Sequence, residues 1–205
     1  MKADELKPFY NSTFRIEALE QYFHQDPATL RMQLFRLCRK KKLIRLKKNC
    51  YTFPDAHPTG LIMAQEMVQP SYHSLESVLS LQGIIPEGVA GYTLVTSKKT
   101  QQYSNIFGNY SYRHLPPELF FGVEQREDGA YVATPEKALL DYLYLNSKSL
   151  KAEFACFQAE RFDRLEEIDF NWIKENAGRY GSKKLLKIIE KLHEYRKSDS
   201  YQAHR

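Results

Sequence analysis

The sequence of 205 residues predicts an α+β protein made of two parts. Three patterns carry this prediction. The N-terminal quarter holds helical periodicity followed by a β-hairpin pattern, the middle holds short strand patterns bounded by turn residues, and the last quarter returns to helical periodicity. We therefore expect a small domain at residues 1–56, a linker with a short helix at 57–70, and a mixed α/β domain with a terminal helical segment at 71–205.

Composition and cysteine usage predict a soluble, cytoplasmic protein. Hydrophobic residues make up 42% of the chain and charged residues 27%. No apolar run reaches the length of about eighteen residues that a membrane span needs, and the N-terminal segment is too polar for a secretory signal. The cysteines Cys38, Cys50 and Cys156 form no Cys-x-x-Cys pair, which argues against a structural zinc site and a disulfide framework. We expect no metal, no cofactor and no membrane partner.

Positive charge is concentrated near the N-terminus. Residues 1–54 hold twelve of the 30 Lys and Arg residues and five of the 25 Asp and Glu residues. The remaining 151 residues therefore hold eighteen basic and twenty acidic residues. Between Pro27 and Pro54 there are nine basic residues and no carboxylate. Such a segment attracts a polyanion, because nothing nearby neutralises it. The alternative is a solvated basic helix face, although solvated faces usually mix both signs.

The N-terminal domain should begin with helices. A short helix is expected near Ala3–Tyr10 and a second over Phe14–Phe23, where apolar residues recur at helical spacing. Asp26-Pro27 then predicts the start of a further helix. An aspartate at the N-cap accepts a hydrogen bond from an unpaired amide, and proline at the first helical position sacrifices no hydrogen bond.

This further helix has two different faces, and a hairpin follows it. Its apolar face is formed by Leu30, Leu34, Leu37 and Cys38. Its polar face is formed by Thr29, Gln33, Arg36 and Lys40, with Met32 and Arg39 at the flanks. After Lys42 the period changes to two strands, Leu43–Leu46 and Cys50–Phe53, joined by the cationic turn Lys47-Lys48-Asn49.

Two helices followed by a basic hairpin are the order of a winged helix-turn-helix, which places its second helix in a major groove of DNA. Cationic side chains neutralise phosphates, while amide and guanidinium groups can read base edges. The residues expected to contact double-stranded DNA are Thr29, Gln33, Arg36, Arg39 and Lys40 on the helix and Arg45, Lys47 and Lys48 on the hairpin. Winged helices also bind proteins, so an adaptor remains the alternative; it predicts a more neutral exposed face.

The second part should alternate strands and helices before it ends in helices. A short helix is expected at Leu61–Val68, and Ser74 is expected to cap a helix that ends near Leu81. The expected strands are Tyr92–Thr96, Tyr110–Leu115, Leu119–Val123 and Tyr131–Ala133. Thr134-Pro135 repeats the capping pattern of Asp26-Pro27 and opens a helix over Glu136–Leu145. The last expected helices are Leu150–Phe157, Asp169–Ala177 and Ser182–Arg196.

No enzyme motif is recognisable in the chain, and we expect no catalytic residues. It lacks a Gly-x-x-x-x-Gly-Lys loop, a Gly-x-Gly-x-x-Gly loop, a His-Glu-x-x-His pair and a Gly-x-Ser-x-Gly elbow. Glu136, Lys137 and Asp141 fit a helix start, with Lys137 on the rim and within reach of Asp141. A metal-dependent nuclease that uses Glu118, Asp128, Glu136 and Lys137 is a third hypothesis, which requires these side chains to converge on a divalent ion.

Four blocks of the second part resemble the antitoxins of AbiEi type. They are SYHSLESVLSLQGIIPEGV at Ser71–Val89, LVTSKKT at Leu94–Thr100, FGNYSYRHLPPELFFGV at Phe107–Val123 and YVATPEKALLDYLYL at Tyr131–Leu145. The Thr-Pro-Glu-Lys-Ala-Leu-Leu-Asp stretch is the most specific of these. The N-terminal part resembles the DNA-binding domain of the same family, with Asn49-Cys50-Tyr51 where many relatives have Gly-x-Tyr.

This resemblance implies a DNA-binding transcriptional autoregulator and antitoxin of a type IV toxin-antitoxin system. Such proteins repress their own promoter by binding inverted repeats through the winged helix. Their C-terminal domain counters a nucleotidyltransferase-like toxin without needing a stable complex with it. Many members are encoded alone, so a solitary winged-helix transcription factor remains open.

Overall fold

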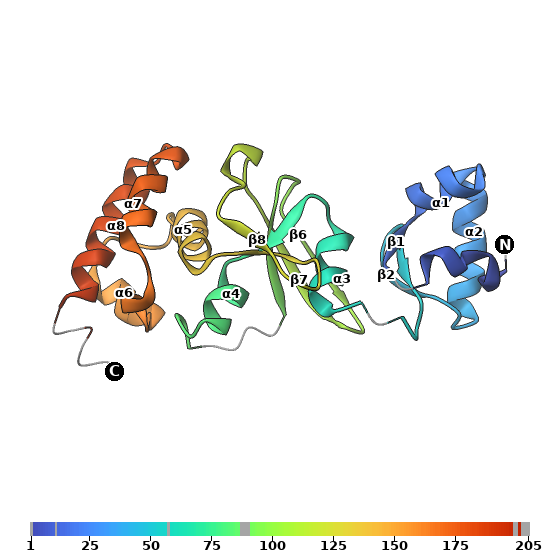
Figure 1. Ribbon diagram of the computed structural model, residues 1–205, viewed down its shortest axis with the longest axis horizontal. Coiled ribbons are helices and arrows are strands. Elements are labelled where there is room, and N and C mark those ends of the chain that lie inside the picture. Colours follow the sequence, from blue (N-terminus) through green and yellow to red (C-terminus); the bar gives the residue numbers. More distant parts are fainter. Residues whose placement is uncertain (1, 11, 57, 87–90, 199–200, 202–205) are drawn as a thin grey trace.

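The computed structural model describes residues 2–10, 12–56, 58–86, 91–198 and 201. Figure 1 shows three regions in a row along the long axis. The N-terminal helices and their small sheet lie at one end, a larger sheet lies in the middle, and the C-terminal helices lie at the other end. The predicted α+β class is confirmed by this mixture of helices and strands.

The N-terminal region packs two helices and a 3-10 turn on a three-stranded sheet. Its elements are η1 (Ala3–Phe9), β1 (Phe14–Arg15), α1 (Ile16–Phe23), α2 (Pro27–Arg39), β2 (Ile44–Lys47) and β3 (Cys50–Thr52), and the sheet order is β1-β3-β2. The expectation of a helix over Phe14–Phe23 was wrong at its start. Phe14 pairs with Tyr51 and Arg15 with Cys50, so these two residues extend the sheet before α1 begins.

The hairpin turn explains the asparagine at position 49. Asn49 has φ of 62°, a left-handed conformation that asparagine tolerates better than most residues and glycine tolerates best. Its carbonyl oxygen accepts a hydrogen bond of 3.0 Å from the backbone N–H of Ile16. The turn is therefore tied to the first residue of α1.

The central sheet has six strands of mixed direction. In the order β6-β7-β5-β4-β9-β8, the pairs β5–β7 and β4–β9 are parallel and the other pairs are antiparallel. The strands are β4 (Ser71–His73), β5 (Tyr92–Thr96), β6 (Gln101–Asn105), β7 (Gly108–His114), β8 (Val123–Gln125) and β9 (Tyr131–Ala133). The strand expected at Leu119–Val123 was wrong, because Pro117–Leu119 form a 3-10 turn (η2) and β8 begins only at Val123.

Helices cover both faces of this sheet. Helix α3 (Gly60–Met67) packs on the face that presents Leu94, Tyr110 and Tyr112. Helices α4 (Glu76–Leu81) and α5 (Pro135–Leu145) pack on the opposite face, which presents Tyr72 and Val95. Ser74 does not cap α4 as expected. Its hydroxyl donates to Asp141 instead, and Leu75 occupies the N-cap position with φ of 62°.

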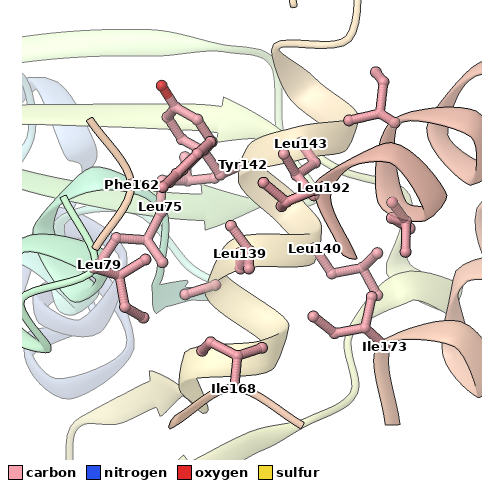
Figure 2. Packing of buried hydrophobic residues seen from close by; sticks show 14 of the residues in the cluster. Leu75, Leu79, Leu139, Leu140, Tyr142, Leu143, Phe162, Ile168, Ile173 and Leu192 are labelled. Atoms are coloured by element: carbon pink, nitrogen blue, oxygen red, sulfur yellow. The ribbon is translucent and has the colours of Figure 1, made fainter. Parts of the chain in front are cut away.

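Helix α5 joins the sheet to the C-terminal helices, which are α6 (Phe154–Glu160), α7 (Phe170–Ala177) and α8 (Lys183–Arg196). Figure 2 shows Leu139, Leu140 and Leu143 of α5 at the centre of this core, between α4 on one side and α7 and α8 on the other. The predicted cap Thr134 accepts a backbone hydrogen bond, and Asp169 and Ser182 cap α7 and α8 in the same way. The helix expected over Leu150–Phe157 begins later, at Phe154.

The small N-terminal sheet contacts the central region directly. Leu46 and Cys50 of the hairpin belong to the same buried cluster as Met63, Ala64 and Met67 of α3. The side chain of Glu66 accepts a hydrogen bond of 3.1 Å from the backbone N–H of Thr13. Helix α3, expected in the linker, therefore lies in an apolar core shared by the small sheet and the central sheet.

Candidate nucleic-acid interface

Helix α2 is held by its buried face and leaves its other face to solvent. The Asp26 carboxylate accepts a hydrogen bond of 3.0 Å from the Thr29 backbone N–H, which confirms the predicted cap. Leu30, Leu34 and Leu37 are buried, while Cys38 is half-buried. A connection of only three residues, 24–26, joins α1 to α2 and positions this exposed face.

Most of the predicted contact residues are exposed on α2 and the hairpin. They are Thr29, Arg36, Arg39 and Lys40 on or beside the helix and Arg45 and Lys48 on the hairpin. Gln33 differs, because it is half-buried and its Oε1 atom is buried without a hydrogen-bond partner among the described residues. Its amide is therefore less accessible than its position on the helix predicted.

Lys47 does not extend into solvent with its neighbour Lys48. Its Nζ atom lies 5.0 Å from the centre of the Tyr103 ring in β6. Partial burial lowers the pKa of Lys47 from its usual value, and the nearby charge of Arg15 adds to this effect. Lys47 thus faces the central region, which could not be predicted from a turn of consecutive lysines.

Sequence reasoning placed Met32 at the flank of the exposed face but missed Phe35 and the groove beside it. Met32 and Phe35 of α2 are 57% and 58% exposed, and a groove of about 300 Å³ separates α2 from the hairpin. Arg31, Phe35 and Cys38 line it from α2, and Arg45, Lys48, Asn49 and Tyr51 line it from the other side. The spacing i, i+4, i+7 of the three helix residues was the signal that could have identified this stripe.

The cationic surface continues onto the central region. A second groove, of about 370 Å³, is lined by Arg15 and Lys47 from the small sheet and by Lys98 and Lys99 from the turn between β5 and β6. Lys98 and Lys99 are exposed. In the described parts of the chain, no carboxylate forms an ion pair with a cation of α2, of the hairpin or of this turn. The cations of α2, of the hairpin and of this turn are therefore available to an anionic ligand, whereas Arg15 already pairs with Glu17 at 3.3 Å.

Lys137 and Asp141, in the first turns of α5, belong to a buried hydrogen-bonded network and do not lie at the edge of an open site. Lys137 and Asp141 are both fully buried, and the Lys137 Nζ atom lies 2.6 Å from Asp141 Oδ1. The ammonium also donates to the Leu119 carbonyl at 2.8 Å and to the Tyr180 hydroxyl at 2.7 Å. The placement of Lys137 on a rim was therefore wrong, because Phe121 and Tyr180 cover it.

All hydrogen-bonding groups of this pair have partners. Asp141 Oδ1 also accepts from Tyr180 at 2.7 Å, and Oδ2 accepts from Tyr72 at 2.8 Å and from Ser74 at 2.9 Å. Burial lowers the pKa of Lys137, while the neighbouring Asp141 carboxylate opposes that effect. Burial and the same carboxylate raise the pKa values of Tyr72 and Tyr180, so both remain phenols that donate. This arrangement is typical of a structural network.

The side chains of the nuclease hypothesis do not converge. Asp128 accepts from Thr59 and from the Ala130 backbone, whereas Glu136 accepts from the Asp169 backbone. Lys137 is enclosed with Asp141, and Glu118 lies in η2. Over the described ranges, no three His, Cys, Asp or Glu side chains are grouped so that they could hold a metal ion.

Comparisons with known proteins give no family assignment. No protein-family model matches the chain, and a search of curated proteins also finds no match. Within the part of the chain that the structure describes, no helix has both the length and the hydrophobicity that crossing a bilayer requires.

Proposed function

We propose that residues 1–56 form a winged helix-turn-helix that binds double-stranded DNA, and that the protein is a DNA-binding transcriptional regulator. The observation that carries this proposal is the exposed face of α2, whose cations lie beside those of the hairpin and pair with no carboxylate of the described residues. The element order supports the proposal, since a short turn joins α1 to α2 and a hairpin follows.

The exposed residues divide into two roles. Arg36 and Arg39 lie on the face of α2 that would enter a major groove, where a guanidinium group can grip a guanine edge. Lys48 lies across a groove from α2, and Lys98 and Lys99 share a second groove with Lys47 of the hairpin. These lysines would contact phosphates. The proposed interface thus extends to lysines beyond residue 56, and DNA binding is best tested with the full chain.

A salt titration of the full chain tests this proposal. Fluorescence anisotropy with a duplex of its promoter should show log K falling with log salt at a slope of about −4 to −6, if four to seven phosphates are neutralised. The double variant Lys98→Ala, Lys99→Ala should reduce the steepness of that slope by about 1–2, because it removes two phosphate contacts.

The control is Lys148→Ala, Lys151→Ala, which removes two exposed lysines from the segment between α5 and α6. Its slope should equal that of the unmodified chain. The absence of binding at low salt would contradict the whole proposal. An unchanged slope for the Lys98, Lys99 variant would remove only the central region from the interface.

Phe35 should contribute apolar recognition of thymine. Phe35 is the aromatic residue of α2, and its ring is exposed. In the major groove this ring could contact the methyl group of thymine. Replacing thymine by deoxyuridine in the promoter duplex should weaken binding by about threefold to tenfold for each contacted methyl. Phe35→Ala should weaken binding to the thymine duplex and abolish this difference.

Leu186→Ala is the matched control, since it removes an exposed apolar side chain from α8 at the far end of the molecule. It should retain the preference for thymine. Unchanged DNA binding by Phe35→Ala would remove Phe35 from the DNA interface and leave its exposed ring to be explained by the adaptor alternative.

The resemblance to AbiEi-type antitoxins extends the proposal to the second domain. On this basis the regulator represses its own promoter and counters a nucleotidyltransferase-like toxin. Growth of cells that express a nucleotidyltransferase-like toxin, with and without this chain, tests the antitoxin role separately from DNA binding. Failure of rescue together with retained promoter binding would leave a solitary transcription factor.

A further inference from the structure

The central region contains a second hollow that DNA binding does not use. It has a volume of about 500 Å³ and lies where residues of α3, α4, β4, β5 and β9 meet. Its wall is mainly apolar and includes Leu61, Val78, Tyr92 and Val132. This size and lining are typical of sites for small organic molecules, in which a few polar groups fix the orientation of the ligand.

His73 supplies one such polar group. It lines the cavity, is only 1% exposed, and its Nε2 atom lies 2.9 Å from the Leu61 carbonyl oxygen. Because a carbonyl only accepts, Nε2 must carry the proton and Nδ1 must be an acceptor. Nδ1 is buried and has no hydrogen-bond partner among the described residues. A buried acceptor without a partner is unfavourable, so a donor on a ligand would stabilise it.

The charge state of His73 agrees with this role. Burial lowers its pKa to about 4, against the opposing effects of the Leu61 hydrogen bond and of Asp128, and the charge of Arg126 adds to the lowering. The imidazole is therefore neutral at physiological pH and keeps its free lone pair. A cationic imidazole would present a second donor instead.

Arg126 supplies a second polar group at the cavity. It is exposed, it lines the hollow, and its backbone N–H donates to the Ala130 carbonyl at 2.8 Å. The neighbouring Asp128 already accepts from Thr59 and Ala130, and no carboxylate of the described residues forms an ion pair with Arg126. Its guanidinium group is thus available to an anion.

We propose that this cavity binds a small aromatic carboxylate that carries a hydroxyl group. The ring would lie against the apolar wall, the hydroxyl would donate to Nδ1 of His73, and the carboxylate would pair with Arg126. This site is independent of the DNA interface, since none of the cations of α2 or the hairpin lines it.

Titration of the full chain with para-hydroxybenzoate tests the proposal. Methyl resonances of Leu61 and Val132 should shift in NMR spectra, and isothermal titration should show binding in the millimolar range or tighter. Benzoate, which lacks the hydroxyl donor, should bind about tenfold more weakly. His73→Phe keeps an aromatic ring but removes the acceptor, so it should bind both acids equally.

Two further variants keep the test decisive. Arg126→Gln changes an exposed side chain without disturbing the core, and it should weaken both acids by a similar factor. His114→Phe changes an exposed histidine of β7 that does not line the cavity, and it should change neither affinity. The proposal is overturned if para-hydroxybenzoate does not bind, or if neither His73→Phe nor Arg126→Gln alters its binding.

Discussion

Replacing Asp141 by alanine is expected to lower the free energy of unfolding by about 3–5 kcal/mol, because it leaves the Lys137 ammonium buried without its counter-charge. Lys137 is fully buried, and its Nζ atom lies 2.6 Å from Asp141. The same substitution leaves the hydroxyl groups of Tyr72 and Ser74 without their acceptor. Urea denaturation followed by circular dichroism measures the change.

The exposed pair Lys191–Glu194 of α8 provides a matched control. It has nearly the same geometry, with 2.7 Å between Nζ and a carboxylate oxygen one helical turn away, but its side chains are 42% and 61% exposed. Glu194→Ala should therefore cost at most about 1 kcal/mol. If Asp141→Ala were no more destabilising than Glu194→Ala, the network would not have the structural role assigned to it.

Local signals in the sequence were enough to predict where α2 and α5 begin. Asp26-Pro27 and Thr134-Pro135 each bring together a side chain that accepts a backbone hydrogen bond and a proline that needs none. Both caps are present in the structure. Because these interactions span only three residues along the chain, no knowledge of the tertiary fold was required.

Features that depend on distant partners could not be predicted in this way. Phe14 is in a strand because Tyr51 lies beside it, and Lys137 is buried because Tyr180 and Phe121 cover it. Lys47 faces Tyr103, which is 56 positions further along the chain. The helical pattern identified the exposed face of α2, but the groove beside Phe35 exists only because the hairpin folds back against that helix.

Reversing two charges on α2 should have the largest effect on DNA binding. The double variant Arg36→Glu, Arg39→Glu removes two exposed guanidinium groups and places two carboxylates on the face proposed to enter the major groove. Each well-made guanidinium contact to a base is worth about 1–3 kcal/mol, and carboxylates near phosphates add repulsion. We therefore expect affinity for the promoter duplex to fall by about 100-fold or more at physiological salt.

The control for this prediction carries the same change in net charge at the other end of the molecule. Lys183→Glu, Lys184→Glu replaces two exposed lysines at the start of α8, and either double variant lowers the formal net charge from +5 by 4 to +1. If DNA were attracted only by the overall charge of the chain, both variants would lose similar affinity. If α2 is the contact surface, the α8 variant should lose less than about threefold, because charges farther away than a Debye length are largely screened. Similar losses in both variants would contradict the assignment of α2 as the recognition helix.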